Sequence, residues 1–171
     1  WSSDVCSSDL DLAVVVVTGG GSALLENPMP GLTLDDVIAV TRALSAAGAD
    51  IRELNTVRQA VSLVKGGGLA RSCRAGRLVA VLLSDVIGDP LDLIASGPCL
   101  PAGAGSAEAL AILRRHGVCG ESAAVTRHLE RAAAAGSAGE PGRSDGDWVT
   151  PSGCHVTHVL LGSNATAVAA A

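Results

Sequence analysis

The sequence predicts an α/β fold built on a mostly parallel β-sheet. Three runs, at 12–17, 78–83 and 155–161, have the length and the β-branched residues of strands. Their apolar residues are continuous rather than alternating, which is typical of strands covered on both faces. Helical patterns separate the three runs, and this order favours parallel strands with helices packed on the faces of the sheet.

The composition limits the classes of function. The 171 residues are enough for one domain with a core, and 48% of them are hydrophobic, which argues against disorder. The chain has no Phe or Tyr and a net charge of −5, so it lacks the aromatic platforms and the basic surface of nucleic-acid-binding proteins. The five cysteines form no C-x-x-C pair, which disfavours a disulfide framework or a zinc site and suits a cytoplasmic protein. No run is long enough to span a membrane.

The first part of the chain predicts a strand followed by two helices. Residues 1–10 fit no pattern that follows and are expected to be an unrelated leader of artefactual origin. After the strand at 12–17, a helix is expected to begin at Thr33, with an acidic residue three positions later completing a capping box. A second helix is expected to be capped by Asn55 and to break at the Lys-Gly-Gly-Gly sequence 65–68.

The second part of the chain continues this alternation. After the strand at 78–83, apolar residues recur at helical spacing over 106–117 and 121–135. A polar loop is expected at 136–147, before the strand at 155–161. A last helix is expected to begin after that strand. This order suits crossover connections between parallel strands.

Each predicted strand ends in small or polar residues. The sequences are Thr-Gly-Gly-Gly-Ser at 18–22, Leu-Ser-Asp at 83–85 and Leu-Gly-Ser-Asn at 161–164. Because the carboxyl ends of parallel strands lie at one edge of a sheet, these clusters are expected to form one polar rim, where open α/β sheets bind ligands. The acidic stretch after the middle strand could instead be a solvated turn, because turns are rich in Asp, Gly and Pro.

A glycine-rich turn follows the first strand at Gly19, Gly20, Gly21 and Ser22. Its residues can turn with positive φ and expose N–H groups that bind phosphate or carboxylate oxygens. The turn matches neither the Walker A sequence nor G-x-G-x-x-G. A tight exit from the strand, without a ligand, is an equally good interpretation.

One lysine stands among the twelve basic residues. Lys65 precedes three glycines at a predicted helix end, and its compact ammonium suits a phosphate contact. The alternative is a helix C-terminus with a cation near the negative end of its dipole and glycine as the cap. Arg58, two helical turns earlier, could hold an anion together with Lys65. It could also form a structural pair with Glu53 or Asp85.

Two carboxylates, Asp85 and Asp89, follow the middle strand. They could bind Mg²⁺, which prefers one or two carboxylates together with phosphate oxygens and water. Either could instead accept a proton from a substrate hydroxyl. Both tasks belong to phosphoryl transfer, in which positioning and charge neutralisation dominate.

Four segments are specific when taken together and in order: TGGGSALLENPMPGLTLDDV, ADIRELNTVRQAVSLVKGGGLA, LSDVIGDPLDLIASGP and LLGSN. In these segments the chain resembles the type II glycerate kinases, the MOFRL family (DUF4147). The resemblance implies an N-terminal Rossmann-like domain with three α/β/α layers, of which 11–171 would be an incomplete part. It also implies ATP-dependent phosphorylation of D-glycerate with Mg²⁺, usually on the 2-hydroxyl, in a cleft against a smaller C-terminal domain. The family's first segment and that C-terminal domain are absent from the sequence, so the fragment alone is expected to be inactive.

The resemblance also implies roles for individual residues. It places the family's glycine-rich loop on Gly19 to Ser22 and further site residues on Asn55, Arg58, Lys65, Gly66, Gly67, Ser84, Asp85, Gly88 and Asp89. The loop and Lys65 would hold phosphate or carboxylate oxygens, Arg58 would orient the substrate carboxylate, and Asp85 would act in catalysis or bind Mg²⁺ with Asp89. The loop after Gly88 is one residue shorter than the double-Asp form that is usual in the family. Residues 59 and 60 are not the basic and the larger residue that are common there.

Two other functions stay open. A hydroxypyruvate reductase, a name sometimes given to this family, would need a dinucleotide fingerprint that the sequence does not contain. A non-catalytic anion-binding α/β domain would use the glycines only as turns. The expected partners are small molecules, D-glycerate and ATP for the kinase, rather than nucleic acid or a membrane. A homodimer is a further expectation.

Overall fold

The computed structural model describes residues 11–18, 20–84, 91, 93–101, 105–136 and 147–162. The elements along the chain are β1 (Leu12–Val17), α1 (Gly21–Leu24), α2 (Leu34–Ala46), α3 (Ile51–Ala60), α4 (Gly68–Ser72), β2 (Arg77–Leu83), the 3₁₀ turn η1 (Ile94–Ser96), α5 (Ser106–Arg115), α6 (Ala123–Ala134), β3 (Trp148–Val149) and β4 (His155–Gly162). The expected leader, most of the expected loop at 136–147 and the helix expected after β4 lie outside the described residues. Within the described part, no helix is long and apolar enough to cross a membrane.

The sheet has the strand order β1-β2-β4-β3. β1, β2 and β4 are parallel, which brings their carboxyl ends to one edge. The predicted strands at 12–17, 78–83 and 155–161 and the mostly parallel sheet are therefore confirmed. The sequence did not predict β3, which is antiparallel to β4, because two residues are too few to carry a period.

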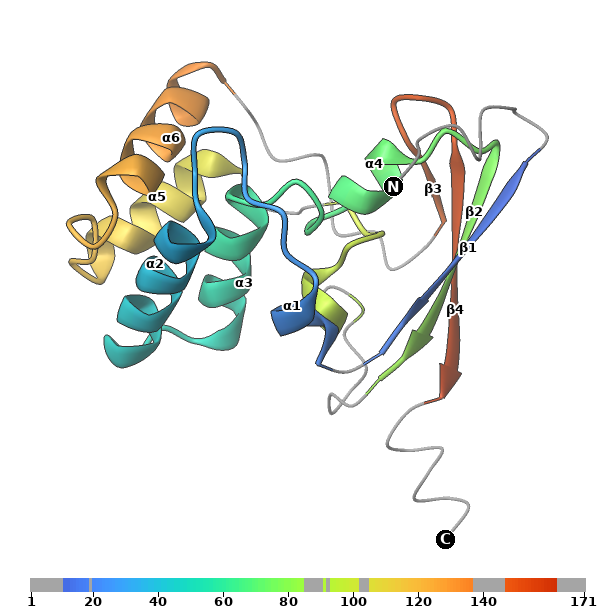
Figure 1. Cartoon of the computed structure of the whole chain (residues 1–171), viewed down its shortest axis with the longest axis horizontal. Helices are drawn as coiled ribbons and strands as arrows, with labels where there is room; N and C mark the ends of the chain where they lie inside the picture. Colours follow the sequence, from blue (N-terminus) through green and yellow to red (C-terminus); the bar gives the residue numbers. More distant parts are fainter. Residues whose placement is uncertain are drawn as a thin grey trace, which may run out of the picture.

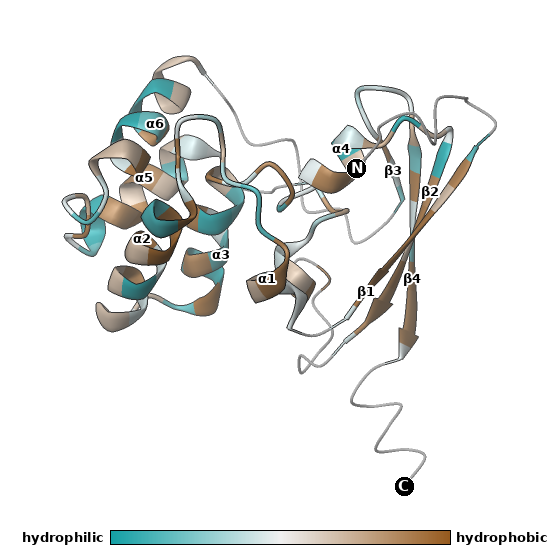
Figure 2. Ribbon diagram, in the orientation of Figure 1, coloured by the Kyte–Doolittle hydropathy of each residue, from teal (hydrophilic) through white to brown (hydrophobic). Residues whose placement is uncertain are grey.

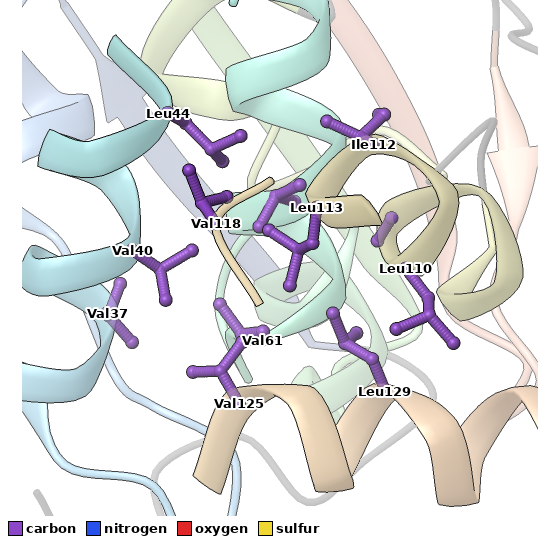
Figure 3. Packing of buried hydrophobic residues seen from close by; sticks show 12 residues of the cluster. Val37, Val40, Leu44, Val61, Leu110, Ile112, Leu113, Val118, Val125 and Leu129 are labelled. Carbon is purple, nitrogen blue, oxygen red and sulfur yellow. The ribbon is translucent and has the colours of Figure 1, made fainter. Parts of the chain in front are cut away.

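The described residues form two separate hydrophobic cores. The first lies among α2, α3, α5 and α6, and Figure 3 shows its side chains pointing toward one another from these helices. The second lies on the inner face of the sheet, against α4 and η1. In Figure 1 the four longer helices lie on one side of the molecule and the sheet on the other, with α1 and α4 between them. The long helices thus pack on one another and not on the sheet as expected, because their apolar stripes together enclose a core of their own.

Capping boxes begin both α2 and α3. The predicted box of Thr33 and Asp36 is present at α2. At α3 the cap is Asp50, whose side chain accepts bonds from the first turn, while the Asp50 backbone N–H donates to the Glu53 carboxylate. The prediction that Asn55 caps this helix is wrong, because the box of Asp50 and Glu53 already satisfies the free N–H groups five residues earlier. Asn55 lies inside α3 and is buried.

The end of α3 also differs from the prediction. The helix ends at Ala60, before the expected break at the Lys-Gly-Gly-Gly sequence. Lys65 therefore lies in the turn that precedes Gly68, the first residue of α4, and not on the same helix face as Arg58. The two cations are brought together by the tertiary fold instead.

The described residues cover the inner face of the sheet. On β1 the alternate residues Leu12, Val14 and Val16 are 58%, 60% and 63% exposed, whereas Val17 is 6% exposed. At the end of β4, Leu161 is 66% exposed. Figure 2 shows that the strands are apolar along most of their length. The continuous apolar runs predict cover on both faces, and the described residues provide it on one.

Candidate active site

Segment 94–100 joins the parts of the chain that carry the predicted site residues. It begins with η1, which contacts both α1 and α3. The backbone N–H groups of Gly66 and Gly67 donate to the carbonyl oxygens of Ser96 (3.1 Å) and Gly97 (2.7 Å). The glycine-rich turn, α3 and the turn after Lys65 therefore meet at one place, which lies between the helices and the sheet where Figure 1 shows α1.

Ser96 is the centre of this meeting point. Its side chain is fully buried, and its hydroxyl donates a hydrogen bond to the Asn55 side-chain oxygen (2.9 Å). Its Oγ lies 2.7 Å from the Ser22 Oγ. Because the Ser96 proton is used on Asn55, the Ser22 hydroxyl is the donor in that contact. The Ser96 carbonyl oxygen also accepts a bond from the Gln59 amide nitrogen (3.2 Å).

The backbone at this centre is strained. Ala95, Ser96 and Gly97 all have positive φ, at 50°, 63° and 62°. Such a conformation costs a non-glycine residue on the order of 1–3 kcal/mol and persists where the surroundings enforce it, often at functional sites. A Cβ added to Gly21 would lie 3.1 Å from the Cβ of Ala95, so the glycine-rich turn packs closely against this strained segment.

Lys65 lies beside these residues and is closed off from solvent. Its side chain is 1% exposed, and its Nζ lies 3.0 Å from the Glu26 carboxylate, which is 10% exposed. The same ammonium donates to the carbonyl oxygen of Leu25. Burial lowers the pKa of the Lys65 ammonium, the contacts with Glu26 raise it, and the charge of Arg58 lowers it further. The alternative of a simple helix C-terminal cation does not describe this residue, since α3 ends at Ala60.

Arg58 is the second cation of the site and is half-buried. Its guanidinium donates to the carbonyl oxygen of Ser22. Burial lowers the pKa of Arg58, and the Glu26 carboxylate opposes this shift. The Glu26 carboxylate therefore acts on both cations, as the ion-pair partner of Lys65 and through its charge on the pKa of Arg58. The structural pair with Glu53 does not form, because Glu53 bonds Arg115 instead.

The glycines after Lys65 are required by close approaches of the backbone. A Cβ on Gly67 would lie 2.8 Å from the Leu100 carbonyl oxygen, and one on Gly68 would lie 2.0 Å from the Leu63 carbonyl oxygen. Both distances are too short for a side chain. The Lys-Gly-Gly-Gly sequence therefore lets this turn pack directly against neighbouring backbone, including segment 94–100.

Four predicted site residues, Gly19, Asp85, Gly88 and Asp89, lie outside the described residues. Ser84 is 8% exposed at the carboxyl end of β2, where its backbone N–H donates to the Gly162 carbonyl oxygen (2.9 Å). Among the residues that the structure describes, no group of three or more His, Cys, Asp or Glu side chains could hold a metal ion. A Mg²⁺ site would therefore depend on carboxylates outside this set.

Two residues that contact the predicted site residues, Ser96 and Glu26, are not predicted from the sequence to belong to the site. Ser96 belongs to the IASGP sequence that carries part of the family resemblance, so a signal was present but no role could be read from it. Glu26 follows the glycine-rich turn and has no motif of its own. Its role depends on a contact with Lys65 across 39 positions of the chain, which no local pattern encodes.

Comparisons with known proteins show which family and which proteins this chain is similar to. A family model described as "Domain of unknown function (DUF4147)" matches residues 4–130. The chain is 43% identical over 162 residues to a glycerate kinase from Macaca fascicularis, covering 94% of this chain and 38% of the relative. It is 44% identical over 108 residues to a D-glycerate 2-kinase from Thermotoga maritima, covering 63% and 26%. It is 47% identical over 108 residues to a putative hydroxypyruvate reductase from Agrobacterium vitis, covering 63% and 25%.

A solved structure has the same fold. The crystal structure of a glycerate kinase from Thermotoga maritima superposes with a TM-score of 0.72 at 34% sequence identity, covering 93% of this chain and 34% of that one. The likeness confirms the predicted α/β fold. In these comparisons the chain spans from 25% to 38% of the length of the protein that it matches.

Proposed function

This chain belongs to the DUF4147 family, and its relatives include glycerate kinases. We therefore propose that it forms part of a kinase that phosphorylates D-glycerate with ATP. The name of the Thermotoga relative, D-glycerate 2-kinase, supports transfer to the 2-hydroxyl. One observation in the chain carries the proposal. Arg58 and Lys65 are two cations removed in part or wholly from solvent, and Glu26 pairs with Lys65 at 3.0 Å, so the guanidinium of Arg58 is the candidate to bind an anion here.

The two substrates suit such a site because D-glycerate has a carboxylate and ATP a polyphosphate. We assign the carboxylate to Arg58, whose planar guanidinium has five N–H donors and uses one of them on Ser22. The turn from Gly19 to Ser22, together with Asn55 and Ser84, is the candidate for binding phosphate oxygens. Gly66 and Gly67 would shape the site, since their N–H groups donate to segment 94–100.

In the proposed reaction, the 2-hydroxyl oxygen of glycerate forms a bond to the γ-phosphorus of ATP while the bond from that phosphorus to the ADP oxygen breaks. The hydroxyl proton passes to a carboxylate, for which Asp85 is the candidate. Mg²⁺, for which Asp85 and Asp89 are the candidate ligands, would neutralise phosphate charge. The chain's contribution is then to position two anions in line, which is the main source of rate in phosphoryl transfer.

The reaction is tested with an intact protein that carries this chain together with the parts found in its longer relatives. D-Glycerate should stimulate release of ADP from ATP, and phosphorus NMR should identify 2-phosphoglycerate as the product. A 3-phosphorylated product would contradict the position of transfer, and no stimulation would contradict the kinase. The 171-residue chain alone should show no turnover, because the proposed active site lies between this part of the protein and a second domain.

The role of Arg58 gives the first prediction. Replacing it by lysine keeps the charge but removes the paired donors that fit a carboxylate, so the KM for D-glycerate should rise at least about tenfold, roughly the loss of one charged hydrogen bond. Steady-state kinetics of the intact protein measure this. Arg42→Lys, at an exposed arginine of α2, is the matched control and should leave KM unchanged. An unchanged KM in Arg58→Lys would remove this residue from substrate binding.

Two other functions have their own tests. The name of the Agrobacterium relative favours a hydroxypyruvate reductase as the second candidate. Oxidation of NADH or NADPH by hydroxypyruvate, without release of ADP from ATP, would support that reaction instead. A non-catalytic anion-binding domain would bind phosphate, as measured by calorimetry, but turn over neither substrate.

The homodimer stays a prediction. Light scattering tests it by measuring the molar mass.

A further inference from the structure

We propose that Lys65 is a positioning residue, whose ammonium anchors Leu25 and Glu26 and thereby fixes the glycine-rich turn, and that it does not contact the substrate. The proposal rests on the proposed function, since it concerns the same site. It changes the role expected of the only lysine in the sequence from a contact with phosphate to a clamp between two segments of the chain.

The two segments, 27–29 and 61–63, are paired in an antiparallel manner. The backbone N–H of Met29 donates to the Val61 carbonyl oxygen (2.9 Å), and that of Leu63 donates to the Asn27 carbonyl oxygen (2.7 Å). An antiparallel bridge between Pro28 and Ser62 lies between these two bonds. Segment 27–29 is therefore fixed against segment 61–63 by its backbone.

Lys65 continues this pairing where the backbone bonds stop. In the same register the partner of residue 65 is residue 25, two positions beyond the bond from Leu63 to Asn27. At this third place the Lys65 side chain supplies the donor, because its Nζ bonds the Leu25 carbonyl oxygen. Its ion pair with Glu26, at 3.0 Å, fixes the next residue as well.

The clamp acts on the end of α1. The backbone N–H of Leu25 donates to the Gly21 carbonyl oxygen (2.9 Å), so holding Leu25 also holds the turn that contains Gly21 and Ser22. Ser22 is in turn bonded by Arg58 and lies 2.7 Å from the Ser96 hydroxyl oxygen. A path of direct contacts therefore connects the Lys65 ammonium to the residues that we assign to substrate.

Burial separates the tasks of the two cations. With its side chain 1% exposed and two protein partners, Lys65 has little surface for a ligand to touch. Arg58 is half-buried and has further N–H donors. A ligand could reach Lys65 only if Leu25 and Glu26 moved aside. The structure thus assigns ligand contact to Arg58 and support of the loop to Lys65.

Kinetics of the intact protein distinguish the two roles through Lys65→Met, Glu26→Gln and the double variant. If Lys65 is a clamp, Glu26→Gln weakens its ion pair and Lys65→Met also removes the bond to Leu25, so both single variants should lower kcat/KM for D-glycerate, Lys65→Met by at least about tenfold, and the double variant should be no worse than Lys65→Met. If Lys65 binds substrate, Lys65→Met should be far worse than Glu26→Gln, and Glu26→Gln should bind the anion as tightly as the parent or more tightly. That second pattern would overturn the proposal.

Nuclear magnetic resonance of the chain itself gives a test that needs no activity and no variant that folds poorly. Because the sequence has one lysine, labelling with ¹⁵N-lysine yields a single side-chain signal, and it belongs to Lys65. A clamped ammonium should give a slowly exchanging NH₃⁺ signal without any ligand. A signal lost to rapid exchange with water, as for an exposed lysine, would overturn the clamp. If the clamp is present but the intact protein turns over no glycerate, the proposed function fails and the clamp does not.

Discussion

The polar side chains of the candidate site are held in place before any ligand arrives. Asn55, Lys65 and Ser96 are 4%, 1% and 0% exposed, and each has a protein partner within hydrogen-bond distance. Burying such groups without partners would cost several kcal/mol. The fold therefore fixes their orientations, and positive φ at Ala95 and Ser96 is the backbone strain that this arrangement tolerates. Side chains fixed in this way lose little freedom when a ligand binds, which is the condition that catalysis by positioning requires.

A group of three cysteines near the sheet gives a prediction of pH dependence. Burial, and to a smaller extent the neighbouring Cys73 and Cys154, raise the pKa of the Cys99 thiol to about 12, and burial raises that of Cys154 to about 11. Both groups have a raised pKa in the folded state, so their stabilising effect is complete below pH 9, the ordinary pKa of a thiol. It is lost as the pH rises from there through the folded values.

Urea unfolding between pH 8 and pH 12 should measure this loss. In the parent chain the free energy of unfolding should fall, relative to Cys99→Ala, by up to about 1.4 kcal/mol for each pH unit above 9. Comparison with the variant removes the opposite contribution of Lys65, whose lowered pKa makes stability rise with pH in the same range. Cys119→Ala, which changes a thiol of the helical core, is the matched control. Parallel pH curves for the parent and Cys99→Ala would contradict the prediction.

At the scale of elements, α4 depends on its first residue. A Cβ on Gly68 would lie 2.0 Å from the carbonyl oxygen and 2.5 Å from the carbonyl carbon of Leu63, and backbone atoms cannot move aside as a side-chain end can. Gly68→Ala should therefore lower the free energy of unfolding by about 3 kcal/mol or more, which marks a severe substitution. Thermal unfolding followed by circular dichroism measures the effect.

A matched glycine shows whether this cost belongs to the site. Gly120 has no positive φ, and no atom lies within 4 Å of the place that an added methyl group would take, so Gly120→Ala should change stability by less than about 0.5 kcal/mol. Equal effects of the two substitutions would mean that Gly68 is not held in close contact. The turn after Lys65 would then be looser than the structure indicates.

Local patterns predicted the elements better than their contacts. The strands at 12–17 and 78–83 have unbroken apolar sequences, and the box that begins at Thr33 is complete within four residues. Asparagine side chains favour helix caps, which is why the sequence predicts a cap at Asn55. In the structure its side-chain oxygen instead accepts a bond from Ser96, 41 positions away. The pairing of Lys65 with Glu26 also depends on a contact between distant positions. The sequence therefore predicts that Lys65 and the neighbouring glycines belong to the site, but it does not predict what each of them contacts.

At the scale of the molecule, the candidate site lies where two independently packed parts meet. The helical core among α2, α3, α5 and α6 and the core on the inner face of the sheet are separate. Ser96 contacts α3 through Asn55 on the helical side, while its neighbours Ile94 and Ala95 belong to the core of the sheet. Relative motion of the two parts would therefore change the site directly. Substrate binding should in turn stabilise their contact, because binding and stability are linked.

The outer face of the sheet gives the last prediction. Val14 and Val17 lie on the same strand, but Val14 is 60% exposed and Val17 is 6% exposed. Changing valine to threonine keeps the β-branched shape and replaces one methyl group by a hydroxyl, so its cost reports whether the position is buried. In urea unfolding of this chain, Val17→Thr should cost about 1–3 kcal/mol, the penalty of a buried unpaired hydroxyl, and Val14→Thr less than about 0.5 kcal/mol. In an intact protein whose further residues cover this face, the two costs should become equal. If Val14→Thr stays neutral there, the apolar outer face of β1 is exposed to solvent in the longer protein too. The burial that the β1 sequence predicts would then not occur at Val14.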